Sequence, residues 1–270
     1  DYEMLKKLEL TKLQMKTLIN HARKVGIDIF TAPFDLETFY QLEKLQIPYY
    51  KIASFDITNL DLIAAVASTK KPIIISTGMS NLSEIEEAVE TVSRQQNNKL
   101  ALLQCTSNYP TPFSNINLKA IDTLKNSFKV PVGLSDHSIG VEIPIAAAAR
   151  GASIIEKHFT LDNSMEGPDH ILSLNPSNFL DMVTKIRNVE QSLGDGVKRV
   201  SPSEFRTIMR FKKTCYTNCD IKKGEIITDK KIILKGPAYG IAPKYKSVIN
   251  GMRANKLIKK DTPIIWEDIS

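Results

Sequence analysis

Two histidines each follow a short apolar run of the sequence. His137 lies three residues beyond the run 130–134, and His158 lies three residues beyond 152–155, with acidic residues beside both. Such β-branched runs indicate buried parallel strands, and in α/β folds the chemistry gathers at the C-terminal ends of these strands. Two imidazoles from neighbouring strands can hold one divalent metal ion. A single histidine is more often a hydrogen-bonded core residue, so the pairing is what favours a metal site.

Strand-like and helix-like segments alternate along most of the chain. Apolar β-branched runs predict strands at 27–31, 49–54, 72–78, 100–106, 130–134 and 152–158. Helical periodicity predicts helices at 4–24, 36–46, 59–69, 82–95, 116–127, 140–150 and 175–193. Strict alternation implies a parallel sheet with right-handed crossovers.

Polar side chains follow all six predicted strands, so the strand ends are expected to converge on one centre. A barrel explains this convergence better than the alternative, an open six-stranded sheet. A barrel of this type has eight strands. The prediction is therefore a TIM-type (β/α) barrel that lacks its first two strands.

The last quarter of the chain differs from the rest in charge and in pattern. Residues 209–270 carry 14 Lys and Arg against 6 Asp and Glu, a balance of +8, whereas the other residues carry 22 against 24. We predict a barrel domain at 1–200, a polar linker at 201–210 and a small module of short strands at 211–270. Basic residues without interleaved aromatics fit a cationic lid over an anionic substrate better than a nucleic-acid surface.

The composition also indicates where such a protein works. No apolar run reaches the roughly 18–20 residues that a membrane span needs. Three cysteines, an odd number, indicate a reducing compartment without a disulfide framework, which we take to be the cytoplasm. Cys215 and Cys219 lie four residues apart with no further ligand nearby, so we interpret them as structural. No membrane partner and no nucleic-acid partner are expected.

Seven short motifs occur in the order of a known family. They are TAPFD (31–35), KIASFD (51–56), ISTGM (75–79), LQCTSNYP (103–110), GLSDH (133–137), IEKHF (155–159) and GPDH (167–170). The chain resembles the sialic acid synthase family, which includes the legionaminate and pseudaminate synthases. Its tail, with DIKKGE at 220–225 and GIAPKY at 240–245, resembles that family's antifreeze-like (SAF, β-clip) domain.

The resemblance implies a transferase reaction. Enzymes of this family condense phosphoenolpyruvate with an N-acylated hexosamine, either N-acetylmannosamine or a diacetamido-dideoxyhexose, for cell-surface polysaccharide biosynthesis. The products are phosphate and a nine-carbon 2-keto sugar acid. The family uses Mn²⁺ or Mg²⁺, and His137 and His158 match its metal ligands. Two neutral imidazoles plus oxygen ligands suit Mn²⁺ better than Mg²⁺.

The resemblance also assigns residues to the two substrates. Lys51 is expected to meet the anionic groups of phosphoenolpyruvate, because a lysine at an apolar strand end needs an anionic partner. Hydroxyl groups from several strand ends match the same subsite; they belong to Thr31, Ser54, Ser76, Thr106 and Ser135. Each of these side chains could instead cap a helix. Ser107 belongs to the motif that holds the catalytic candidate Tyr109.

Asp56, Tyr109 and Asp169 match the positions that bind the sugar, although either aspartate could serve only as a turn or N-cap residue. Phe55-Asp56 is nearer the pseudaminic type, whereas Ser107 to Tyr109 and 167–170 are nearer the sialic or legionaminic type. The acceptor sugar therefore stays open between these pathways.

The resemblance implies a domain-swapped homodimer in which the antifreeze-like domain of one subunit covers the barrel of the other. Lys259 matches the family's cation on that lid, which is commonly an arginine. The family's first two strands carry a glutamate and a lysine of the active site. A chain without them is expected to be inactive by itself.

Two other functions fit parts of the pattern. A Schiff-base aldolase on the same barrel would need a lysine that faces the interior, and Lys51 and Lys157 are both eligible. A non-catalytic carbohydrate-binding or scaffold protein derived from such an enzyme is the second alternative. Retention of both histidines argues against that alternative.

Overall fold

The structure is a computed structural model that describes residue 6 and residues 8–270. Residues 4, 5 and 7 of the predicted first helix lie outside the described residues. The chain forms two compact units, one that ends at Asp195 and one that spans Gly196–Ser270. Each unit has its own apolar core, so each is described by itself.

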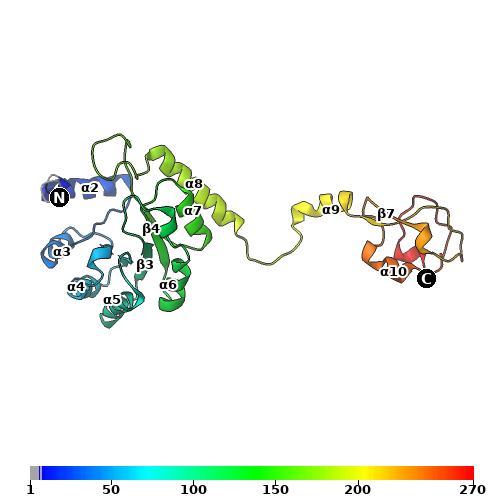
Figure 1. The fold of residues 1–270 in the computed structure, drawn as a ribbon, viewed down its shortest axis with the longest axis horizontal. Coiled ribbons are helices and arrows are strands. Elements are labelled where there is room, and N and C mark those ends of the chain that lie inside the picture. Colours follow the sequence, from blue (N-terminus) through cyan, green and yellow to red (C-terminus); the bar gives the residue numbers. More distant parts are fainter. Residues whose placement is uncertain (1–5, 7) are drawn as a thin grey trace. The chain divides into compact units, whose positions relative to one another are not determined.

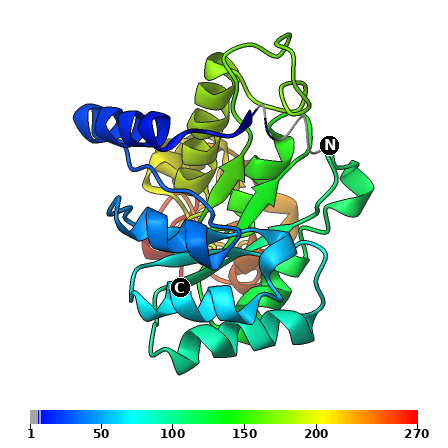
Figure 2. The ribbon, with the colours of Figure 1, turned by 90° about the vertical axis from the view of Figure 1, so that its left-hand side faces the viewer.

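The first unit is a parallel five-stranded sheet with helices along one face (Figures 1 and 2). Its strands are β1 (Tyr50–Ile52), β2 (Ile73–Ser76), β3 (Leu100–Cys105), β4 (Val132–Asp136) and β5 (Ile155–Lys157). Its helices are α2 (Lys12–Val25), α3 (Leu36–Glu43), α4 (Leu60–Ser68), α5 (Leu82–Arg94), α6 (Ala120–Phe128), α7 (Glu142–Ala149) and α8 (Pro176–Ser192), with the short η1 (Ser54–Asp56) and η2 (Phe113–Asn115). The strands lie side by side in chain order. This is how a barrel winds, whereas the strand order of a doubly wound sheet reverses.

Polar residues at the helix starts explain where several helices begin. The side chain of each capping residue accepts a hydrogen bond from a backbone N–H of the first turn, which would otherwise lack a partner. The capping residues are Thr11 for α2, Asp35 for α3, Asn59 for α4, Asn81 for α5 and Asn175 for α8. The positions of these helices therefore follow from local sequence.

One predicted strand is wrong. Residues 27–31 pair in no ladder with any strand of the described part of the chain. The segment does run near the start of β1, because the Phe30 and Tyr49 ring centres lie 5.1 Å apart. Ile27 is 65% exposed, however, and Phe30 is also exposed. The apolar run therefore buries too little surface to hold a strand against the sheet.

The core of the first unit lies between the sheet and its helices. Ile52, Ile75 and Leu134 leave the strands on the side of this core and are almost completely buried. Residues next to them in the strands, including Ser76 and Ser135, lie on the opposite face because side chains alternate along a strand. The helices thus cover one face and leave the polar strand-end residues on the other.

Gly133 permits the close approach of β4 and β5. A Cβ atom at this position would lie 2.3 Å from the carbonyl oxygen of Ile154 and 2.7 Å from Cδ2 of Leu103. The first contact is with backbone, which cannot move without shifting the neighbouring segment. Only glycine therefore fits between these strands.

The second unit is small and mostly irregular. Its antiparallel strands are β6 (Thr214–Thr217) and β7 (Ile232–Lys235). Its helical segments are η3 (Pro202–Glu204), α9 (Phe205–Phe211), η4 (Asp229–Lys231), η5 (Pro243–Tyr245), α10 (Lys246–Ile249) and η6 (Trp266–Asp268). Most of the segment that we interpreted as a linker, 201–210, is therefore helical. No described helix is both long and apolar enough to cross a membrane.

The substitution Gly133→Ala is expected to lower the free energy of unfolding by about 1–3 kcal/mol, because the added methyl group overpacks the β4–β5 contact. Urea unfolding followed by circular dichroism measures this change. The exposed Leu180→Ala in α8 is the control, with an expected change within about 0.5 kcal/mol. Equal stability of the two variants would contradict the close strand contact.

Candidate active site

A cleft of about 420 Å³ lies at the C-terminal ends of the five strands. Side chains from all five strand ends line it, as expected for a barrel-type site. Eight predicted residues meet here: Lys51, Ser54, Ser76, Ser107, Tyr109, Ser135, His137 and His158. Ala53, Phe55, Met79, Cys105 and Glu156 complete the lining.

The two histidines are neighbours in this cleft. Their ring centres lie 5.2 Å apart and the rings are nearly perpendicular. His137 Nδ1 lies 3.0 Å from the backbone carbonyl oxygen of Thr106 and donates its proton there, so Nε2 is the nitrogen that can bind a ligand. His158 Nδ1 lies 3.5 Å from Asp169 Oδ2, which turns its Nε2 away from that carboxylate.

The two imidazoles differ in their affinity for protons. Burial lowers the pKa of His158, so this ring is neutral at pH 7. Burial also acts to lower the pKa of His137, but hydrogen bonds with Cys105 and with the Thr106 carbonyl outweigh it and raise that pKa. A neutral His158 is ready to act as a ligand, whereas the raised pKa of His137 means that a cation competes there with a more tightly held proton.

An aromatic ring covers the histidine pair. The ring centre of Tyr109 lies 4.2 Å from that of His137 and 5.8 Å from that of His158. Thr106 contributes to this side of the cleft through its backbone, since its hydroxyl donates to the Asn115 carbonyl, 3.0 Å away. The predicted role of the Thr106 hydroxyl therefore has a competing partner in the protein.

Beside the imidazoles, the cleft offers a positive charge and hydroxyl groups. Lys51 Nζ lies 3.6 Å from Glu156 Oε2, and Ser135 Oγ donates to Glu156 Oε1 at 2.6 Å. Ser76 Oγ is buried in the cleft lining and has no hydrogen-bond partner among the described residues. A buried hydroxyl without a partner is costly, so a ligand is the expected partner.

The Lys51–Glu156 contact shows how strongly the sheet is curved. Lys51 belongs to β1 and Glu156 to β5, the two edges of the five-stranded sheet. In a flat sheet four strand spacings would separate these edges by about 19 Å. Side chains from both edges nevertheless meet across the cleft. The sheet therefore curls as part of a barrel does.

Gly78 lets three polar side chains approach one another at the floor of the cleft. Its N–H donates to Ser54 Oγ at 3.1 Å. A Cβ atom on residue 78 would lie 2.5 Å from Ser107 Oγ, 2.8 Å from Ser54 Oγ and 3.1 Å from Cys105 Sγ. Any other residue here would displace hydroxyl groups that line the cleft.

Three further predicted residues, like Thr106, lie outside the lining of the cleft. Asp169 approaches His158, as described above. Asp56 is buried in η1, burial raises the pKa of its carboxyl group, and its Oδ2 has no partner among the described residues. Thr31 is partly exposed on the segment before α3. Asp56 and Thr31 therefore reach the substrates only if these extend beyond the cleft.

Lys259 belongs to the second unit. Its amino group donates to Asp220 Oδ2 at 3.0 Å, and both side chains are exposed. A surface pair of this kind is held weakly. Lys259 is therefore free to exchange Asp220 for another anionic or polar group.

The sequence prediction missed Glu156 and Cys105 as lining residues. A signal was present for Glu156, because it lies two residues before His158 and strand alternation puts both on one face. Cys105 ends β3 and lies two residues before Ser107 in the same way. Burial acts to raise the pKa of the Cys105 thiol, but hydrogen bonds with His137 and Ser54 outweigh it and lower that pKa.

The structure distinguishes the two lysines that a Schiff-base mechanism would need. Lys157 lies on the face of β5 that points away from the cleft, where its Nζ is 2.6 Å from Asp136 Oδ2 and completely buried. An ammonium held in this way cannot attack a carbonyl group in the cleft. Lys51 is the remaining candidate, and its amino group faces Glu156.

The histidine pair is compatible with one shared metal ion but does not enclose it. No group of three or more His, Cys, Asp and Glu side chains among the described residues forms a metal site. A metal–nitrogen bond of about 2.1 Å puts an ion about 3.3 Å from a ring centre, so ring centres 5.2 Å apart allow one ion between them. Such an ion would take its other ligands from water or substrate oxygens.

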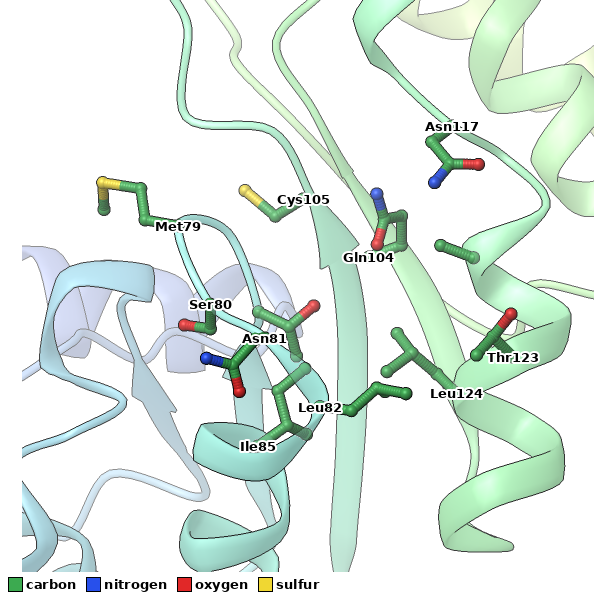
Figure 3. A pocket seen from close by; sticks show the side chains of 12 residues that line it. Met79, Ser80, Asn81, Leu82, Ile85, Gln104, Cys105, Asn117, Thr123 and Leu124 are labelled. Atoms are coloured by element: carbon green, nitrogen blue, oxygen red, sulfur yellow. The ribbon is translucent and has the colours of Figure 1, made fainter.

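A second cavity of about 340 Å³ lies next to the cleft and shares Met79 and Cys105 with it. Figure 3 shows Leu82 and Ile85 of α5 on one side and Leu124 of α6 on the other, with Gln104 of β3 near them. Gln104 Nε2 donates to the Ile116 carbonyl at 3.1 Å. This cavity holds no charged side chain and none of the predicted site residues.

Fold and site together define a (β/α)-barrel protein whose cleft combines a lysine and several hydroxyl groups with a pair of imidazoles. Comparison with known proteins gives the family. The model of the NeuB family matches residues 1–198, and that of the SAF domain matches residues 216–270. The chain belongs to the NeuB family. The predicted resemblance, the barrel-type fold and the SAF domain are thereby confirmed.

Several relatives are similar over almost the whole chain. An N,N'-diacetyllegionaminic acid synthase of Campylobacter jejuni is 44% identical over 96% of this chain and 78% of its own length. A pseudaminic acid synthase of Helicobacter pylori is 38% identical over 99% of this chain and 79% of its own. The crystal structure of an N-acetylneuraminic acid synthetase of Leptospira borgpetersenii superimposes with a TM-score of 0.72, at 37% identity over 76% of this chain and 72% of that one.

The substitution Lys51→Met is expected to weaken binding of inorganic phosphate at least tenfold, because it removes the cation from the hydroxyl-rich side of the cleft. Isothermal titration calorimetry measures this affinity. Lys99→Met is the control, since Lys99 is exposed and directly precedes β3, at the other end of the sheet. Equal affinities of the two variants would place the anion elsewhere.

Proposed function

We propose that this chain is a nonulosonic acid synthase. It condenses phosphoenolpyruvate with an N-acylated hexosamine, forms a nine-carbon 2-keto sugar acid and releases phosphate. The observation that carries the proposal is the cleft itself, where Lys51 and several hydroxyl groups face two adjacent imidazoles. The reaction needs both features, because one substrate is an anion and the other is an aldehyde.

Phosphoenolpyruvate would bind on the lysine side of the cleft. Lys51 supplies the positive charge, Ser54 supplies a hydroxyl group from the end of the same strand, and Ser76 and Ser135 supply hydroxyl groups from β2 and β4. Ser76 Oγ is already buried and lacks a partner among the described residues, so a phosphate or carboxylate oxygen would satisfy it. An incoming anion would also separate Lys51 from Glu156, whose contact of 3.6 Å is loose. Thr31 and Thr106 complete the proposed set from outside the lining.

His137 and His158 would hold a divalent metal ion, Mn²⁺ in preference to Mg²⁺. When bound, such an ion supplies Lewis-acid chemistry that polarises the aldehyde of the sugar. The Thr106 carbonyl holds the Nδ1 proton of His137, which directs the other nitrogen to the ligand. Asp169 would orient His158 similarly, because its carboxylate lies next to Nδ1 and leaves Nε2 for the ligand.

The sugar would bind over the histidine pair. Tyr109 covers both rings and offers a face for the sugar. Asp56 and Asp169 carry carboxyl oxygens that can accept hydrogen bonds from hydroxyl groups, and Oδ2 of Asp56 has no partner within the described chain. Ser107 contributes a hydroxyl from the floor of the cleft. The relatives are named as synthases of three different acids, legionaminic, pseudaminic and N-acetylneuraminic, so an assay with each acceptor must identify the sugar.

The mouth of the cleft favours a second subunit as a lid. Large apolar side chains that follow the strand ends are exposed; they are Phe55, Met79, Tyr109, Phe113, Ile139 and Phe159. Apolar side chains in such a ring indicate a surface that another protein element covers. We propose that the SAF domain of a partner subunit covers it in a domain-swapped homodimer.

Three free cysteines fit a reducing compartment, for which we propose the cytoplasm.

Phosphate release tests the reaction. The assay contains phosphoenolpyruvate, Mn²⁺ and one of three acceptors, N-acetylmannosamine or the diacetamido sugars that lead to legionaminic and pseudaminic acids. Release with one acceptor is expected once the two strand–helix units that the family resemblance implies are supplied, and EDTA and His137→Ala should abolish it. His21→Ala, at an exposed position in α2, should leave the rate unchanged. If the chain releases no phosphate, the assay is repeated with those two strand–helix units joined to its N-terminus. No release from that longer protein would overturn the synthase proposal.

Lys259→Ala tests the lid. If Lys259 reaches the sugar from the partner's SAF domain, its loss should lower kcat/KM by about 100-fold, since one positioned charge stabilises the transition state by about 3 kcal/mol. The matched control is Lys235→Ala, because Lys235 also pairs with an exposed aspartate of the same unit. Unchanged kcat and KM in Lys259→Ala would remove the lid role from this residue.

A further inference from the structure

We propose that the buried ion pair between Lys157 and Asp136 positions the two histidines of the cleft. The pair lies on the face of β4 and β5 that points away from the cleft, whereas His137 and His158 lie on the cleft side. The inference takes one point from the proposed function, namely that His137 and His158 share a metal ion.

The pair is unusually well buried. Lys157 Nζ lies 2.6 Å from Asp136 Oδ2, and the two side chains are 0% and 1% exposed. By comparison, the side chains are 11% and 38% exposed in Lys51–Glu156, 26% and 33% in Lys71–Glu43, and 63% and 4% in Lys256–Asp268. Charges without water are held only where further hydrogen bonds complete their surroundings.

Those further hydrogen bonds involve both neighbours of His137 in the chain. The Lys157 amino group donates to the Ser138 carbonyl as well as to Asp136. The Ser138 N–H donates to Asp136 Oδ1 at 3.0 Å. Residues 136 and 138 are thus both tied to residue 157, which directly precedes His158. The network fixes the backbone on each side of one histidine relative to the backbone before the other.

The strand register makes this link specific. Asp136 and Lys157 are direct partners in the parallel β4–β5 pairing. The pairing ends at Asp136 and Lys157, and a histidine directly follows each of these two residues in the chain. No further ladder holds the two histidines together beyond that point in the described chain. The ion pair therefore acts where the sheet stops and the cleft begins.

Stability alone does not explain such a pair. Well-packed apolar residues in place of a buried ion pair are often neutral or stabilising, because charges lose their hydration when buried. Two imidazoles that share one ion must instead be held to within about 0.5 Å. The three hydrogen bonds among Asp136, Ser138 and Lys157 have fixed directions, so they restrict the backbone in a way that apolar packing does not.

The test separates position from stability. The double variant Asp136→Leu/Lys157→Met removes both charges together, so neither is left unpaired. We expect it to fold with a urea midpoint at or above that of the unmodified protein. We also expect its Mn²⁺ affinity, measured by electron paramagnetic resonance, to fall 10–100-fold, the range found when groups that orient metal ligands are lost. Unchanged Mn²⁺ affinity in this folded variant would overturn the proposal.

A matched control uses another ion pair of the same unit. Glu43 and Lys71 form a contact of 2.5 Å and are only partly buried. Glu43→Gln/Lys71→Met should leave Mn²⁺ affinity unchanged. A fall as large as in the first double variant would show a general loss of rigidity and would also overturn the proposal.

Two further measurements cover the remaining outcomes. If the double variant does not fold, Asp136→Asn keeps the shape of the side chain and is measured in its place. If the unmodified protein binds no Mn²⁺, the proposed metal site fails. The crystal structure of the variant then decides, because loss of the positioning pair should change the 5.2 Å separation of the histidine rings. An unchanged separation would leave the ion pair without a positioning role.

Discussion

The curvature of the parallel sheet is the constraint on which the rest of the site depends. Because the strands pair in chain order and the sheet curls, side chains from its two edges meet across one cleft, as Lys51 and Glu156 do. A flat sheet with the same strands would hold these side chains apart, and Ser135 could not share Glu156 with the lysine. The positive side of the cleft and the imidazole side are brought together only by this curvature.

Close strand approach and strand alternation divide the residues of β4 and β5 between two tasks. Gly133 lets the strands come together, and beyond it the side chains alternate between the cleft and the helices. Ser135, Glu156 and the histidines face the ligand side, whereas Asp136 and Lys157 form a buried link behind them. Adjacent residues of one strand thus divide between the lining of the cleft and the buried link behind it.

Some polar atoms of the site have hydrogen-bond partners within the protein and others do not, and this difference indicates where a ligand can bind. The charged groups behind the cleft have their hydrogen bonds, as in the Lys157–Asp136 pair, although the nearby Ser138 Oγ has no partner in the described chain. Ser76 Oγ at the cleft and Asp56 Oδ2 beside it lack partners in the described chain, and His137 and His158 make hydrogen bonds or ion contacts through Nδ1. Polar atoms that protein groups leave unsatisfied are those that a ligand can satisfy. Ser76 and Asp56 therefore offer atoms that a ligand can satisfy, whereas the Lys157–Asp136 pair supports the backbone of β4 and β5.

The sequence by itself determined the five strands that pair, most helix starts, the two-part organisation and the eight cleft residues. It could do so because caps, periodicity and strand-end positions are local properties. Tertiary structure alone decided that residues 27–31 stay outside the sheet, since burial depends on what lies opposite a segment. It also decided that Lys157 faces away from the cleft and pairs with Asp136, that Thr106 acts on His137 through its carbonyl, and that Lys51 meets Glu156. These contacts join residues that are 21 or more positions apart, and no local pattern encodes the direction in which a strand turns its alternate side chains.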